Sequence, residues 1–129
     1  MIPSAYNNNF QIVQSPGHVV IVNEMVHSAR VVPMDGRPHA PSNIRLLVGD
    51  SRGRWDGETL VVETTNFTDQ TSFRGTTKNM RLIERFTRVG PDRLNYEFTV
   101  DDPASYARSW TAMVPTKRNP ERIYEYACQ

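Results

Sequence analysis

The chain of 129 residues has the size of one domain and can bury a core without disulfides or a structural metal. Its 15 Lys and Arg residues balance 14 Asp and Glu residues, and the two signs are mixed along the chain. This balance argues against nucleic acid or an anionic membrane as the main partner, because both require a concentrated basic face. We therefore expect one domain over residues 1–129 that recognises its partner through a pocket or a local surface.

Targeting and redox signals are few. The longest apolar stretches, HVVIV and TLVV, are far shorter than the ~20 residues of a membrane helix, so we expect no membrane partner. No charged segment followed by an apolar one marks a signal peptide near Met1. Cys128 is the single cysteine, which allows no internal disulfide, and we expect an inert thiol there.

Alternation of apolar and polar residues at period two predicts strands along the chain. The clearest case is LNYEFTV at 94–100, which GPDR at 90–93 joins to the preceding strand in a predicted hairpin. The expected strands cover 10–14, 18–23, 29–33, 58–64, 80–89, 94–100, 110–114 and 122–126. Short strands between turn signals predict an all-β domain, a closed or nearly closed antiparallel barrel or jelly roll with about eight strands.

Two segments between these strands have other expected forms. Residues 41–49 have room for one short helical turn, and no longer window carries a helical apolar stripe. The segment NFTDQTSFRGTTKN at 66–79 is polar with two phenylalanines, which indicates a long loop or lid. Because loops of this length are often functional, we expect it near the site.

The stretch GRWDGETLVVETTNF, with ERFTRV, YEFTVDDP and YEYAC downstream, resembles an uncharacterised family of mostly exported proteins from soil bacteria. The resemblance covers nearly the whole chain. It implies secretion or a periplasmic location, with the signal absent from this chain, and brings no established activity. A second resemblance is architectural: about eight short antiparallel strands look like a cupin jelly roll or a lipocalin-like barrel. Cupins often hold a metal, but the usual cupin HxH pattern is missing here, so that implication rests on fold analogy.

The histidines suggest a metal site in NEMVHSARVVPMDGRPH. His18 and Glu24 are six residues apart on one strand, or about 20 Å, so they do not share a metal unless the chain bends. A reversal after Asn23 and a turn at 35–36 would instead bring together Glu24, His27 and His39. Two imidazoles and a carboxylate suit copper, iron, manganese or zinc. The alternative is that these polar residues are incidental.

Glu84 is the candidate catalytic residue. It shares strand parity with Leu82 and Phe86, so it points inward if they do. A carboxylate in an apolar interior would have a raised pKa and could act as a general acid or base. In the alternative interpretation Ile83 marks the buried face, and Glu84 is solvated or paired with an arginine.

Substrate contacts are expected from Trp55, Arg54 and Arg37, which lie near turn signals. For most aromatic residues, core packing is the better interpretation. The glycines at 49–57 lack the spacing and the lysine of a phosphate-binding loop, so we expect no nucleotide cofactor. Ser, His and Asp occur without a nucleophile-elbow motif, so an acyl-transfer triad is not indicated.

Two functions from different classes remain. The first is a small His-ligated metal enzyme of cupin type, an oxidoreductase that acts on an extracellular small molecule or polysaccharide. The second is a metal-free barrel that binds a small apolar or aromatic ligand, and a structural domain of a larger exported protein is a further alternative. A homodimer is compatible with both, because a β dimer leaves no reliable sequence signal.

Overall fold

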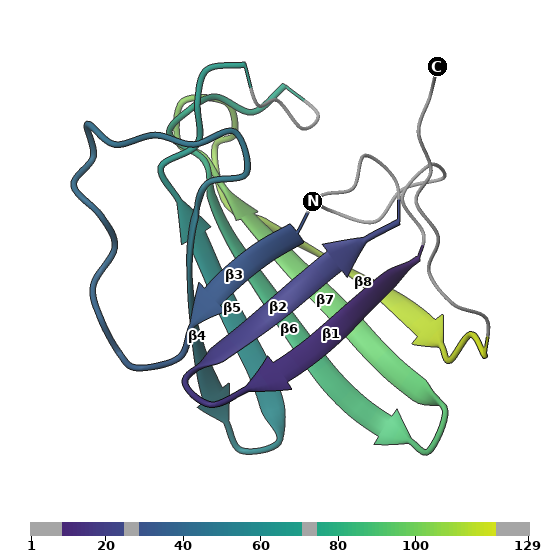
Figure 1. Ribbon diagram of the computed structural model, residues 1–129. Coiled ribbons are helices and arrows are strands. Elements are labelled where there is room, and N and C mark those ends of the chain that lie inside the picture. Colours follow the sequence, from purple (N-terminus) through teal and green to yellow (C-terminus); the bar gives the residue numbers. More distant parts are fainter. Residues whose placement is uncertain (1–8, 25–28, 71–74, 121–129) are drawn as a thin grey trace, which may run out of the picture.

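The computed structural model describes residues 9–24, 29–70 and 75–120, and these contain eight antiparallel strands (Figure 1). The strands are β1 (Phe10–Ser15), β2 (His18–Asn23), β3 (Ala29–Pro33), β4 (Asp50–Asp56), β5 (Thr59–Thr65), β6 (Arg81–Gly90), β7 (Arg93–Asp101) and β8 (Trp110–Lys117). The all-β prediction is confirmed, and β2 and β3 have the expected bounds. The strand expected at 122–126 lies outside the described residues.

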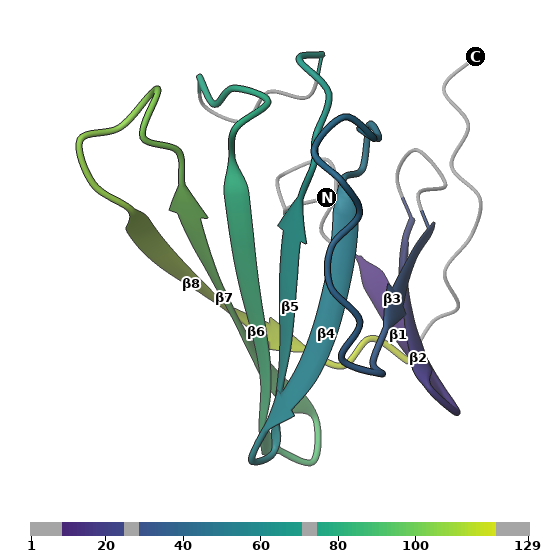
Figure 2. The same cartoon turned by 90° about the vertical axis from the view of Figure 1, so that its left-hand side faces the viewer.

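The strands form two sheets whose order follows the chain, β1-β2-β3 and β4-β5-β6-β7-β8. Figures 1 and 2 show the three-stranded sheet as a separate layer that crosses one face of the five-stranded sheet. We expected a closed or nearly closed antiparallel barrel or a jelly roll. No ladder links one sheet to the other within the described residues, so these strands form two antiparallel sheets and not a closed barrel. The edges β3 and β4 lie close together, whereas β1 and β8 are the outer strands at the other edge.

Gly53 lies where β4 meets the three-stranded sheet. A Cβ atom at this position would collide with Met34 Sδ and lie 2.9 Å from Val32 Cγ1. Because real Cβ atoms do not approach other atoms this closely, the absence of a side chain lets the two sheets come together at the β3–β4 edge. Close packing against Val32 and Met34 therefore explains the glycine in the middle of DSRGRWD.

The strand β4 was missing from the sequence prediction. Its sequence, DSRGRWD, has neither alternation nor β-branched residues, but it pairs with the apolar strand β5 along its whole length. On the inner face, the Ser51 and Thr64 hydroxyls form a buried hydrogen bond of 2.8 Å. Tertiary pairing therefore overrides the weak local preference. Residues 41–49 form turns, closed by Ile44 N to Pro41 O and by Gly49 N to Leu46 O, without the expected helical turn.

The core lies between the inner faces of the sheets. The β6–β7 hairpin is confirmed, with a register irregularity between Arg88 and Gly90. The core cluster consists of Val19, Ile21 and Val32 from the three-stranded sheet, Leu60, Val62, Leu82, Phe86, Tyr96, Phe98 and Val100 from the five-stranded sheet, and Phe67 and Met80 from the segment between β5 and β6. Among the described residues, no helix is long and apolar enough to cross a membrane.

Candidate functional site

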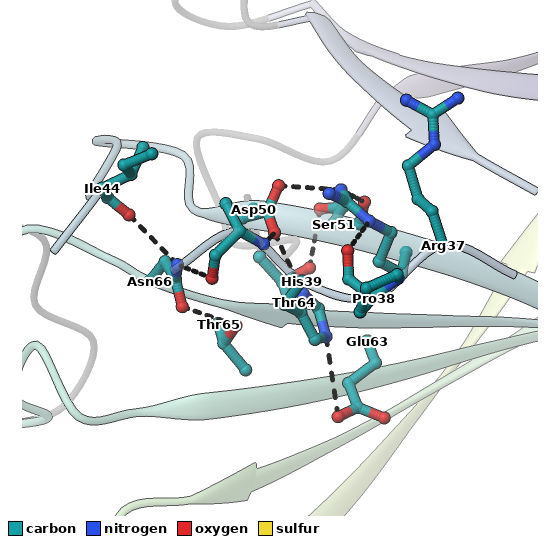
Figure 3. A network of polar contacts seen from close by, with 12 residues as sticks. Arg37, Pro38, His39, Ile44, Asp50, Ser51, Glu63, Thr64, Thr65 and Asn66 are labelled. Carbon is teal, nitrogen blue, oxygen red and sulfur yellow. Dashed lines mark hydrogen bonds and ion pairs between the residues drawn. The ribbon is translucent and has the colours of Figure 1, made fainter. Parts of the chain in front are cut away.

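His39 lies between two carboxylates on the outer face of the five-stranded sheet (Figure 3). Its Nδ1 is 3.1 Å from Asp50 Oδ2, and its Nε2 is 3.7 Å from Glu63 Oε1. Burial raises the pKa of Asp50, but the Ala40 N–H, His39 and the Arg52 guanidinium outweigh it and hold this pKa below its ordinary value. The hydrogen bond from Arg81 lowers the pKa of Glu63. Both carboxylates are therefore ionised at neutral pH.

Asn66 fixes the loop that carries His39. Its backbone has φ 60°, a left-handed conformation that asparagine tolerates. Its Nδ2 is 2.9, 3.0 and 3.1 Å from the carbonyl oxygens of Ala40, Pro41 and Ile44. One amide group thus holds the segment 40–44 against the end of β5, and it belongs to the start of the loop predicted at 66–79.

The predicted metal ligands belong to different polar networks. The Glu24 carboxylate accepts a hydrogen bond of 2.6 Å from Asn9 Nδ2 at the edge of the three-stranded sheet, whereas His39 contacts β4 and β5. His27 lies outside the described residues. Over 9–24, 29–70 and 75–120, no three His, Cys, Asp or Glu side chains are grouped as metal ligands.

Glu84 points into the core, as its parity with Leu82 and Phe86 predicts, and it is 1% exposed. Arg30 donates two hydrogen bonds to its carboxylate, of 2.7 and 3.0 Å, and the Tyr96 hydroxyl donates a third of 2.6 Å. Burial alone would raise the pKa of Glu84, but the Arg30 charge and hydrogen bonds outweigh burial, and the pKa is lowered. The expected raised pKa is therefore wrong. Because the outer-face Glu63 pairs with Ile83, the sheet separates Glu84 from His39.

The predicted substrate contacts also lie apart. Arg37 forms an exposed ion pair with Asp35, and Figure 3 shows it pointing away from His39. Trp55 is 51% exposed near the end of β4, and Arg54, its neighbour on the strand, faces the other side of the sheet. Trp55 is five residues beyond Asp50, or about 16 Å along the strand. The structure does not join Arg37 or Trp55 to His39 or Glu84 in one site. Arg54 lies on the outer face with Glu63, and its charge adds to the hydrogen bond from Arg81 in lowering the pKa of that carboxylate.

A groove of about 900 Å³ lies instead on the open side of the molecule, between the start of β1, the turn that joins β6 to the start of β7, and the end of β8. Figure 1 shows these strands on the side opposite β3 and β4. On the five-stranded sheet the groove includes Arg88, Leu94 and Thr116, which are cross-strand neighbours in one row. The next row on the same face of the sheet is Phe86, Tyr96 and Val114, and these residues belong to the core or pack against it.

Phe10 and Ile12 supply the apolar lining from β1. Both are partly buried and pack against the core, where the Phe10 ring lies 6.0 Å from Phe86 and 6.2 Å from Tyr96. Leu94 adds apolar surface from β7. The apolar part of the groove is thus continuous with the core through the Phe10 ring.

The charged residues of the lining are mostly cations: Arg88, Arg93, Lys117 and Arg118, with one acid, Asp92. None of the four cations forms an ion pair in the part of the chain that the structure describes, and the same holds there for Arg45, Arg54, Lys78 and Arg108. Sequence reasoning missed this group, although its signal is visible as basic residues at 88, 93, 117 and 118 beside predicted strand ends.

Comparisons with protein-family models, with curated proteins and with solved structures found no match to this chain.

Proposed function

We propose that this domain is a binding module that holds a small ligand with an apolar part in the groove between β1, the start of β7 and the end of β8. The observation that carries the proposal is the continuity of the groove lining, Phe10, Ile12 and Leu94, with the core. Ligand sites are typically concave and largely apolar, with a few polar groups that set the orientation. A groove of about 900 Å³ has the volume of such sites.

The strand order supports a lipocalin-like form of this fold. A jelly roll is built from Greek keys, in which sheet neighbours are distant in sequence, whereas both sheets here follow the chain. Lipocalins bind one small ligand between strands in consecutive order. The proposed module would bind at the unclosed side of such an arrangement.

The test uses Nile red, an uncharged apolar dye whose fluorescence rises on leaving water. We expect saturable binding to the wild-type protein and at least tenfold weaker binding to Ile12→Trp, because the larger ring fills the groove. The matched control is Val13→Trp, since Val13 is exposed and lies outside the groove. Equal loss of binding in both variants, or none in Ile12→Trp, would contradict the proposal.

The His-ligated metal enzyme remains a separate prediction, with Glu24, His27 and His39 as its ligands and Glu84 as its acid or base. Titration with copper, iron, manganese and zinc, followed by metal analysis, tests it directly. Stoichiometric binding that is lost in His27→Ala and His39→Ala would support it, and binding unchanged by both substitutions would contradict it. Membership in the exported soil-bacterial family is likewise still a prediction.

A further inference from the structure

We infer that the ligand of the groove is a free amphipathic anion, an alkyl or aryl chain that ends in one carboxylate or phosphate. The inference rests on the proposed function and adds the chemistry of the ligand. The groove combines an apolar lining, Phe10, Ile12 and Leu94, with cations that lack counterions in the described structure. A purely apolar ligand would form no ion pair with these cations.

The arrangement of the cations indicates an anion site. Arg88 is the cross-strand partner of Leu94, and Leu94 is the partner of Thr116, so Arg88 lies on the face of the sheet that carries the apolar lining. Arg118 is two residues beyond Thr116 and so keeps this face, and its backbone N–H donates to the Asp92 carbonyl at 2.8 Å. An anionic group at this end of the groove would meet both guanidinium groups.

The roles of the cations differ. Arg88 donates to the carbonyl oxygens of Gly90 and Pro91, at 3.2 and 2.9 Å, so part of its hydrogen-bonding capacity holds the turn. Arg118 is exposed, and its side chain forms no such bond within the described residues. Arg93 and Lys117 alternate with Leu94 and Thr116, so they belong to the opposite face of the sheet. Arg118 is therefore the residue whose loss should weaken anion binding while leaving the turn intact.

The apolar lining distinguishes this ligand from a simple anion. Inorganic phosphate would contact the cations and leave Phe10, Ile12 and Leu94 exposed to water. A chain that extends from the cationic end toward the Phe10 ring would bury apolar surface, at roughly 25 cal/mol per Å². Affinity should therefore increase with chain length for a fixed head group.

The test is calorimetric titration with decanoate, decanol and decyltrimethylammonium, which share one chain and differ in charge. Decanoate should bind at least tenfold more tightly than the other two at low ionic strength, and salt should reduce the difference. The variant Arg118→Gln should weaken decanoate about threefold and leave decanol unchanged. Its control is Arg93→Gln, which removes an exposed arginine from the opposite face of the sheet.

The outcomes separate the two proposals. Equal binding of all three probes, blocked by Ile12→Trp, would overturn the anion inference and uphold the binding module. No binding of any probe, together with no Nile red binding, would overturn both. Vesicles of phosphatidylglycerol form another arm: groove-dependent binding to vesicles without binding of decanoate would overturn the inference of a free ligand.

Discussion

Replacement of Glu84 tests whether the buried ion pair holds the two sheets together. Arg30 comes from β3, whereas Glu84 comes from β6, so the two hydrogen bonds from Arg30 to Glu84 cross between the sheets. The bond from Tyr96 on β7 to Glu84 lies within the five-stranded sheet. The side chains of Arg30 and Glu84 are 3% and 1% exposed. At an effective dielectric constant of about 20, two charges about 4 Å apart attract by about 4 kcal/mol.

We expect Glu84→Gln to lower the free energy of unfolding by about 3–5 kcal/mol, because it keeps the shape but leaves the Arg30 charge buried without a partner. A domain of this size has a total stability of about 5–15 kcal/mol, so the loss is large. Urea unfolding, followed by tryptophan fluorescence and circular dichroism, measures it.

The triple variant Arg30→Met/Glu84→Leu/Tyr96→Phe removes the whole polar group from the core. It should restore stability to within about 2 kcal/mol of the wild type, since buried ion pairs are often no more stabilising than well-packed apolar residues. A cost below about 1 kcal/mol for Glu84→Gln would refute the reasoning. So would a triple variant less stable than Glu84→Gln, because then the charges themselves would be essential.

Three further predictions concern stability. Burial, and then the negative charge of Glu84, raise the pKa of Tyr96. The contribution of the Tyr96 hydroxyl to folding stability is therefore complete below the unfolded-state pKa of about 10 and falls as pH rises above it. Tyr96→Phe should reduce this loss of stability, which unfolding measured from about pH 9 to 11 would show. Gly53→Ala should cost about 1–3 kcal/mol through its clash with Val32, while Gly90→Ala, whose Cβ would have an ordinary 3.9 Å contact, should change stability by less than about 0.5 kcal/mol. Asn66→Ala should cost about 1–3 kcal/mol, and Asn66→Gly less, because glycine retains the positive φ; unchanged melting in both would contradict the role of Asn66 in holding the loop.

The fold was predictable where one strand carries its own pattern. Alternation identified β7, and the apolar run HVVIV identified β2, because their side chains meet the core with a regular period. The strand β4 carries no such pattern, and its pairing with β5 supplies the missing signal. The separation of the strands into two sheets could not be predicted from the sequence either, since it depends on how β3 and β4 pack around Gly53.

The candidate site was predictable only in part. Strand parity identified Glu84 as a buried carboxylate, but its partner Arg30 is 54 residues away, so the sequence did not reveal the ion pair that lowers its pKa. His39 was singled out, but its neighbour Asp50 begins the strand that was missed. The groove cations come from separate strand ends, and only the register places them together.

Gly53 and the groove lie at opposite edges of the two sheets, so the spacing of the sheets at Gly53 affects their spacing at the groove. The sheets meet at β3 and β4, where Gly53 carries no side chain, and the groove lies between β1 and β8. A methyl group at position 53 would push β3 away from β4 and tilt the three-stranded sheet. A substitution outside the groove would then change the width of the groove, and with it the size of the ligand that we propose for it.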